Sequence, residues 1–256
     1  MDDQSTPSVR EQVGEDEWKA RCDLAALYRL VRMHGWDDLF FTHISMRVPG
    51  PEEHFLLNPF GLLYEDVTAS NLVKVDLDGN VLPPSTFGIN PAGFTIHSAI
   101  HAARPDVKVA LHLHTDQGVA VSAQKRGLLP ISQTAMTIMN DVSYHDYEGI
   151  ALIEDEKVRL VADLGEKNLM ILRNHGTLSV GANPFQAYLR IFNLERACNM
   201  QIMALSGGAE LIEWDQAKQD LVFSQANEGV TNEFFAEIAW AALRSRVDRE
   251  SPGYDQ

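Results

Sequence analysis

Cysteine is scarce in this chain of 256 residues, which contains only Cys22 and Cys198. The two lie far apart and form no CxxC motif, so the sequence offers neither a disulfide framework nor a cysteine-based zinc site. Both fall in segments whose pattern predicts helix. We interpret them as buried apolar side chains of a reduced, cytoplasmic protein, with a disulfide or a reactive thiol as the alternative.

Long apolar runs and basic residues are also in short supply. No stretch of about 18 consecutive apolar residues occurs, which argues against a membrane-spanning helix. The first residues, MDDQSTPSVREQVGEDEW, are acidic and lack the apolar core of a signal peptide. Lys and Arg number 21 against 36 Asp and Glu, and the resulting net charge of −15 argues against nucleic acid or an anionic membrane as a partner.

No internal repeat, low-complexity linker or composition shift divides the chain. We therefore expect one α/β domain over residues 15–245, with a flexible tail at 1–14 and a C-terminal tail at 246–256. Short strand-like segments separated by turn residues indicate a partly antiparallel sheet, with helices packed on it.

Apolar periodicity places the main elements. Apolar residues at i, i+3, i+4 and i+7 between Leu24 and Val31 predict a helix that Gly35 ends. The other predicted helices are Pro91–Arg104, a segment that begins at Asn183-Pro184, and a last one over Phe235–Ala242. The predicted strands are Phe40–Val48, His54–Leu57, Val73–Asp76, Val81–Leu82, Val107–His114 and Leu169–Leu172, the third and fourth forming a hairpin around Asp78-Gly79.

The placement of the histidines is the most informative chemical feature. His112 and His114, in ALHLHTD, are two residues apart on a predicted strand, so both side chains leave the same face. His175, in LRNHGTL, follows a later strand directly before a glycine turn. Three imidazoles with an open fourth position are typical of a catalytic metal site. Spacing alone leaves a second interpretation open, that of hydrogen-bonded strand histidines.

Several ordered motifs carry a family resemblance. The run NPAGFTIHSAIHAARPDVKVALHLHTD, then ILRNHGTLSVGANP, and upstream FTHISMRVPG and LLNPFGLLYEDVTASNLVKVDLDGNVL resemble the class II aldolase/adducin family, from about Glu15 to Leu211. The resemblance implies a three-layer α/β/α domain with a central mixed, largely antiparallel sheet. It also implies a homo-oligomer, usually a tetramer, with active sites at subunit interfaces.

The resemblance further implies that His112, His114 and His175 hold a divalent metal ion, most often zinc, with iron, manganese or cobalt as alternatives. In the family's enzymes this metal acts as a Lewis acid on the oxygens of a small-molecule substrate and stabilises an enediolate.

The chain departs from the family's aldolases at the acid/base position. Those enzymes carry a glutamate four residues before the first histidine of the HSAIH-type helix. Here that position is Gly93, and its neighbours Ala92 and Phe94 do not titrate either. The usual proton-transfer group is therefore missing.

The phosphate subsite departs as well. Thr42-His43 stands where those aldolases have Gly-Asn, and Phe60-Gly61 where they have Thr-Gly. A phosphate needs several N–H donors or a cation, which an acidic chain with Phe at this turn supplies poorly. We therefore expect a substrate without phosphate, bound near His43, Phe60 and Gly61.

The family's aldolases also borrow a tyrosine from a neighbouring subunit, and Thr134 stands at that place here. The following stretch offers Tyr144, His145 and Tyr147 as replacement catalytic groups, or as surface and interface contacts only. His97 and His101, at i and i+4 on a predicted helix, fit packing or support of the site better than metal binding.

Three hypotheses follow. The first is a metal-dependent lyase that performs retro-aldol cleavage or decarboxylation of a non-phosphorylated hydroxy-carbonyl compound. The second is an iron(II) oxygenase that uses the same three histidines, which fits the lost glutamate because oxygen activation needs open metal positions more than a base. The third is a non-catalytic, adducin-like assembly module, against which the retention of all three histidines counts.

Overall fold

The structure is a computed structural model that describes residues 7–149 and 154–256. An eight-stranded sheet runs through its centre in the order β4-β3-β2-β1-β5-β8-β7-β6. Neighbouring strands are antiparallel except β6 and β7, which are parallel. The strands are β1 (His43–Arg47), β2 (Phe55–Leu57), β3 (Val73–Val75), β4 (Val81–Leu82), β5 (Val109–Leu113), β6 (Val142–His145), β7 (Leu169–Leu172) and β8 (Gly176–Gly181).

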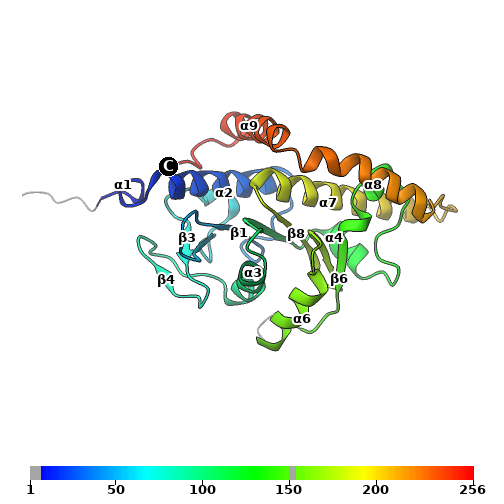
Figure 1. The fold of residues 1–256 in the computed structure, drawn as a ribbon, viewed down its shortest axis with the longest axis horizontal. Helices are drawn as coiled ribbons and strands as arrows, with labels where there is room; N and C mark the ends of the chain where they lie inside the picture. Colours follow the sequence, from blue (N-terminus) through cyan, green and yellow to red (C-terminus); the bar gives the residue numbers. More distant parts are fainter. Residues whose placement is uncertain (1–6, 150–153) are drawn as a thin grey trace, which may run out of the picture.

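Helices cover both faces of the sheet, so the predicted three-layer α/β/α fold with a mixed, largely antiparallel sheet is confirmed (Figure 1). One face carries α2 and α7, with α8 and α9 outside them, and the other carries α3 and α6. The helices are α1 (Val9–Gln12), α2 (Glu15–Met33), α3 (Pro91–Ala103), α4 (Asp116–Ser122), α5 (Gln133–Met136), α6 (Glu154–Leu164), α7 (Pro184–Ser206), α8 (Gln216–Val230) and α9 (Glu233–Glu250), with 3₁₀ turns at Tyr64–Asp66 and Met139–Asp141.

Strand alternation divides the core into two clusters. Ile44, Leu111 and Leu113 belong to the large cluster beneath α2 and α7. Ala110 and Leu178 belong to the cluster on the opposite face, beneath α3 and α6. Because side chains alternate along a strand, residues 43 and 112 lie on the α3 face together with this second cluster.

Helix α2 matches its prediction. The apolar residues between Leu24 and Val31 that predict it are buried, and Gly35 has a φ of +65°, the conformation that suits a glycine after a helix. Tyr28 joins this helix to the sheet, because its hydroxyl accepts a hydrogen bond of 2.9 Å from the backbone N–H of Ile44.

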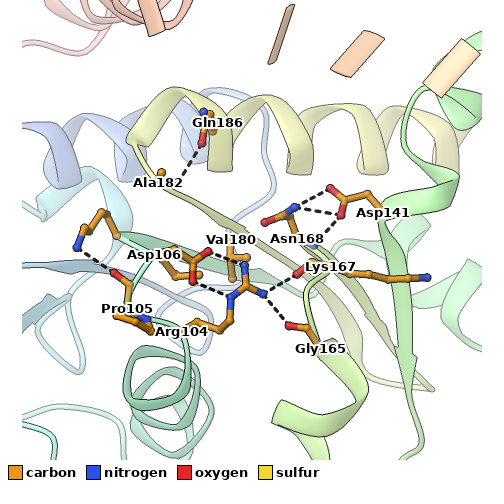
Figure 2. Close-up of polar contacts among 12 residues, drawn as sticks. Arg104, Pro105, Asp106, Asp141, Gly165, Lys167, Asn168, Val180, Ala182 and Gln186 are labelled. Atoms are coloured by element: carbon orange, nitrogen blue, oxygen red, sulfur yellow. Dashed lines mark hydrogen bonds and ion pairs between the residues drawn. The ribbon is translucent and has the colours of Figure 1, made fainter. Parts of the chain in front are cut away.

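A polar network closes the end of the sheet where β5 begins and β8 ends (Figure 2). Arg104 donates to both carboxylate oxygens of Asp106, at 2.8 and 2.7 Å. The same guanidinium donates to the carbonyls of Gly165 and Lys167, in the turn that follows α6. These bonds fasten the entry of β5, and the histidines lie at the opposite end of the same strands.

The C-terminal residues pack against the domain. Helix α9 continues to Glu250, and Tyr254 is 1% exposed, with its carbonyl accepting a bond of 2.7 Å from Ala69 N–H. Residues 246–256 therefore do not form the tail that the sequence predicts. Of the predicted N-terminal tail, residues 1–6 lie outside the described residues, and α1 with its Ser8–Glu11 capping box lies inside them.

Cys22 and Cys198 are both buried and unpaired, as predicted. In the part of the chain that the structure describes, no helix is both long enough and apolar enough to cross a bilayer.

Candidate metal centre

His112, His114 and His175 converge at one end of the central strands. His112 lies in β5, His114 directly follows it, and His175 directly precedes β8. Since β5 and β8 are antiparallel neighbours, the end of one meets the start of the other. One ligand nitrogen from each of the three histidines lies within 4.8 Å of the other two.

The turn before β8 is shaped for this approach. A Cβ at Gly176 would overlap the carbonyl oxygen of Leu113, so only glycine allows the two strands to meet here. Asn174, on the other side of His175, has a φ of +55°, a conformation that non-glycine residues seldom adopt. Local strain of this kind clusters at functional sites.

Hydrogen bonds fix the tautomers of two of these rings. Nδ1 of His112 lies 2.9 Å from the carbonyl oxygen of Thr177, and Nδ1 of His114 lies 3.0 Å from a carboxylate oxygen of Asp38. Both partners are acceptors, so each Nδ1 carries a hydrogen and each Nε2 of a neutral ring carries a lone pair. The two Nε2 atoms lie 2.9 Å apart. Two lone pairs at that distance repel, and a bound cation would remove the repulsion.

The donor set fits a divalent metal. Burial, followed by the neighbouring His114, His175 and His43, holds the pKa of His112 well below its usual range. The pKa of His175 is lowered to about 4, mainly by burial and then by His114 and His145. Both rings are therefore neutral near pH 7, as metal ligation requires. Three imidazoles suit zinc, and also iron, manganese or cobalt.

Two carboxylates support the histidines from outside the cluster. Asp38 lies on the loop after α2, beside Leu39, whose φ is +52°. Glu195 of α7 is 3% exposed and accepts hydrogen bonds from the hydroxyls of Thr115 and Thr177. Its burial raises the pKa of Glu195 to about 7. Thr115 follows the end of β5 and Thr177 lies at the start of β8, so Glu195 joins these two strand ends.

A cavity of about 480 Å³ lies beside the cluster. Its lining includes His114, Asp38 and Glu195, together with Trp36 and Arg196. The site is thus adjoined by a space of the size that small molecules occupy. The sequence gives no local signal for Asp38, because it meets His114 only through the fold.

The structure puts His43 next to the cluster and Phe60 at the surface. His43 is the register partner of His112, and their ring centroids are 5.3 Å apart. Phe60, on the turn after β2, is 47% exposed, and its ring meets that of Phe40 edge to face at 5.6 Å. Gly61 follows with a φ of +95°, which suits a glycine in a turn.

Of the three replacement catalytic groups that the sequence suggests, Tyr144 and His145 are engaged within their own chain. The Tyr144 hydroxyl accepts a bond of 3.0 Å from Leu128 N–H, and its ring lies under the Arg173 guanidinium. His145 is 3% exposed, with Nδ1 2.7 Å from a carboxylate oxygen of Asp163. Tyr147, in contrast, is 57% exposed.

His97 and His101 of α3 are fully buried and hydrogen-bonded away from the three-histidine cluster. Nε2 of His97 lies 2.9 Å from Nδ1 of His43, and its Nδ1 contacts the Ser45 hydroxyl. Nε2 of His101 lies 2.8 Å from the same hydroxyl. This arrangement agrees with the packing or supporting role that the sequence favours.

Comparison with known proteins connects this geometry to a family. The model of the family described as "Class II Aldolase and Adducin N-terminal domain" matches residues 22–202. A Caulobacter vibrioides protein whose name assigns it to aldolase class 2 is 56% identical over 250 residues, which cover 97% of this chain and 96% of that protein. Mouse alpha-adducin is 51% identical over 195 residues, 74% of this chain but 26% of the adducin.

Solved structures are similar over nearly the whole chain. An aldolase II superfamily protein from Pseudomonas syringae has a TM-score of 0.92 and 50% identity, covering 97% of this chain and 99% of that one. The L-fuculose 1-phosphate aldolase of Glaciozyma antarctica has a TM-score of 0.80 and 28% identity, covering 97% and 96%.

Proposed function

This chain belongs to the class II aldolase and adducin family, and from that membership we propose that it is a divalent-metal-dependent lyase. It performs retro-aldol cleavage or decarboxylation of a non-phosphorylated hydroxy-carbonyl compound. The supporting relatives are the Caulobacter class 2 aldolase protein and the fuculose-phosphate aldolase. We expect the protein to act in the cytoplasm.

One observation carries the proposal. Nε2 of His112 and Nε2 of His114 lie 2.9 Å apart, while the Nδ1 atom of each ring faces an acceptor. A domain without a metal would gain nothing from two lone pairs that face each other in a partly buried cluster. With His175 as the third ligand, the three histidines would hold the metal ion through the number of protein ligands that is typical of catalytic zinc sites.

When bound, a divalent cation supplies Lewis-acid polarisation of the carbonyl and hydroxyl oxygens of the substrate. We assign zinc as the metal, with iron, manganese and cobalt as alternatives. The chain itself holds the ligands in place: Asp38 keeps His114 in one tautomer, and the Thr177 carbonyl does the same for His112. Glu195 adds negative charge close to the strand ends that carry the ligands.

The substrate contacts are assigned to His43, Phe60 and Gly61. Phe60 exposes an aromatic surface next to Phe40, and no Lys or Arg of the described residues pairs with His43. These features suit an uncharged or flat substrate portion better than a phosphate.

Proton transfer to or from the substrate is assigned to a residue of a neighbouring subunit. That residue lies in the stretch that contains Tyr144, His145 and Tyr147. Tyr147 is the strongest of the three because its side chain is exposed, whereas the other two are engaged in their own chain. The proposal therefore includes a homo-oligomer, a tetramer, with active sites at subunit interfaces. Exposed apolar side chains on α9, such as Phe234, support such an assembly.

Elemental mass spectrometry of protein purified without chelator or a His-tag tests the proposal. We expect about one zinc per chain in the wild type, since three imidazoles form a single site. The variant His112→Ala should lose the metal, and His54→Ala, which alters a histidine remote from the cluster, should keep it. Absence of any metal after reconstitution would refute the lyase.

A second candidate function is an adducin-like assembly module without catalysis, which the 51% identity to alpha-adducin supports. It predicts that His175→Ala changes only the assembly of the protein, whereas the lyase predicts a loss of activity. Iron in place of zinc, with oxygen consumption, would instead support the oxygenase.

A further inference from the structure

Position 93 lacks a side chain, and the structure contains a physical reason for this. Gly93 lies in α3, a helix in which alanine would be the more stable choice. A Cβ added to Gly93 would overlap the ring of His43, with Cγ at 2.7 Å and Cδ2 and Nε2 closer still. The imidazole of His43 thus occupies the space into which any side chain at position 93 would project.

The ring of His43 cannot easily move aside, because three buried side chains hold it. Nδ1 of His43 bonds Nε2 of His97 at 2.9 Å, and Nδ1 of His97 bonds the Ser45 hydroxyl. That hydroxyl also lies 2.8 Å from Nε2 of His101. The side chains of His43, Ser45, His97 and His101 are all at most 5% exposed. Breaking the hydrogen bonds between them would therefore leave polar atoms without partners in the interior.

These hydrogen bonds also determine which nitrogen of His43 is free to bind a ligand. Its Nδ1 is taken by His97, so Nε2 is the ring nitrogen that remains for a ligand. The ring lies next to that of the proposed metal ligand His112, with centroids 5.3 Å apart. Among the described residues no carboxylate pairs with His43, so the ring presents one uncharged nitrogen beside the metal site.

We propose that His43 is the specificity-determining group that binds a hydroxyl of the substrate beside the metal ligands, and that residue 93 is glycine in order to make room for it. This inference rests on the proposed lyase function and extends it to the substrate class. A single neutral nitrogen forms one hydrogen bond with a hydroxyl, whereas a phosphate needs several donors or a cation. His97, Ser45 and His101 act as positioning residues.

A double-mutant cycle tests the shared space. We expect Gly93→Ala to lower the melting temperature of the wild type by roughly 3–10 °C, as overpacking does. In the background of His43→Ala the same change should cost little, because the ring that it strikes is gone. Gly229→Ala, in helix α8 with nothing within 4 Å of its added Cβ, is the matched control and should not lower stability. An equal fall in melting temperature in both backgrounds would show that the His43 ring does not occupy the space of a side chain at position 93.

Calorimetric binding of two probes to zinc-loaded protein tests the role in recognition. Acetohydroxamate and glycolohydroxamate both chelate zinc through two adjacent oxygens, and only the second adds a hydroxyl. The wild type should bind glycolohydroxamate roughly 3- to 10-fold more tightly, the range of one hydrogen bond. His43→Ala should abolish this preference. A preference that persists in His43→Ala, or none in the wild type, would overturn the inference, and so would tighter binding of the phosphate ester of glycolohydroxamate.

The two proposals fail differently. If neither hydroxamate binds the zinc-loaded wild type, the lyase function fails. If both bind equally well to the wild type and to His43→Ala, the metal site stands and only the assignment of His43 falls.

Discussion

A carboxylate oxygen of Asp38 lies 3.0 Å from Nδ1 of His114, although 76 residues separate the two in the sequence. The loop after α2 thereby reaches across to the end of β5. A carboxylate in this position fixes the ring orientation and raises the basicity of the opposite nitrogen, which is the one that faces His112. The candidate metal centre therefore combines the three histidines of the sequence motifs with a supporting carboxylate that the motifs do not contain.

Removal of the Asp38 carboxylate should weaken metal binding without unfolding the domain. We expect Asp38→Ala to lower zinc affinity about 10- to 100-fold, the usual effect of losing such a partner. Competition with a chelator of known affinity measures this. Asp37→Ala is the control, because Asp37 lies on the same loop and pairs with Arg32 instead. Equal affinity in the wild type and Asp38→Ala would show that the contact does not support the metal.

Replacement of Glu195 by glutamine should lower the affinity for metal while leaving the stability of the fold nearly unchanged. Because burial raises the pKa of Glu195 to about 7, the metal-free protein already holds much of this group in its neutral form. The neutral amide in Glu195→Gln should therefore change the melting temperature of metal-free protein by less than about 4 °C. Zinc affinity should fall, because a negative charge near the cation is lost. Unchanged zinc affinity would contradict this role, and Glu213→Gln, at a surface pair with Arg126, serves as control.

Acid should destabilise the metal-free protein. Burial lowers the pKa of both His97 and His101 to about 3 and that of His175 to about 4, against 6.5 for an exposed histidine. Below pH 6.5 the unfolded chain therefore binds more protons than the folded one, and stability falls as the pH decreases towards these values. Glu195 opposes the trend, since its raised pKa adds stability as the pH falls below about 7, but the histidines outnumber it.

Thermal unfolding of metal-free protein at pH 7.5 and pH 5.5 measures this effect. We expect a melting temperature lower by roughly 5–15 °C at the lower pH. The variant His101→Gln removes one of these groups and should show a smaller difference between the two conditions. A higher melting temperature at pH 5.5 would reverse the sign of the prediction.

A charged side chain introduced on the apolar face of α9 should dissociate the oligomer. Phe234 is 72% exposed and Ile238, one helical turn later, is 55% exposed, so they form an apolar strip on this helix. Light scattering should give the wild type a mass of about four times the 28.5 kDa of one chain. Phe234→Glu should give a smaller species that stays folded, and Glu237→Gln on the same helix should not. A monomeric wild type would contradict both the assembly and the shared active site.

Local patterns were sufficient for much of the fold. The apolar spacing in α2 and the Asn183-Pro184 start of α7 predict helices that the structure contains, because amphipathic periodicity and capping act within one element. The six predicted strands hold for the same reason, with ends that differ from the observed ones by at most three residues. The C-terminal segment could not be predicted in this way. Tyr254 is held by a contact with Ala69, nearly two hundred residues away in sequence, and no local sequence pattern indicates such a contact.

The same division applies to the site. Two features of the site could be predicted before the fold was known: His112 and His114 share a strand face because of the two-residue period, and Gly93 carries no titratable group. The family resemblance already pointed to His175 as the partner of the two histidines. Its approach to within 4.8 Å of them, the support from Asp38 and Glu195, and the position of the His43 ring over Gly93 depend on the three-dimensional fold. The difference comes from sequence separation: strand period and helix capping act over a few residues, whereas antiparallel pairing and side-chain packing bring together atoms that are dozens of residues apart.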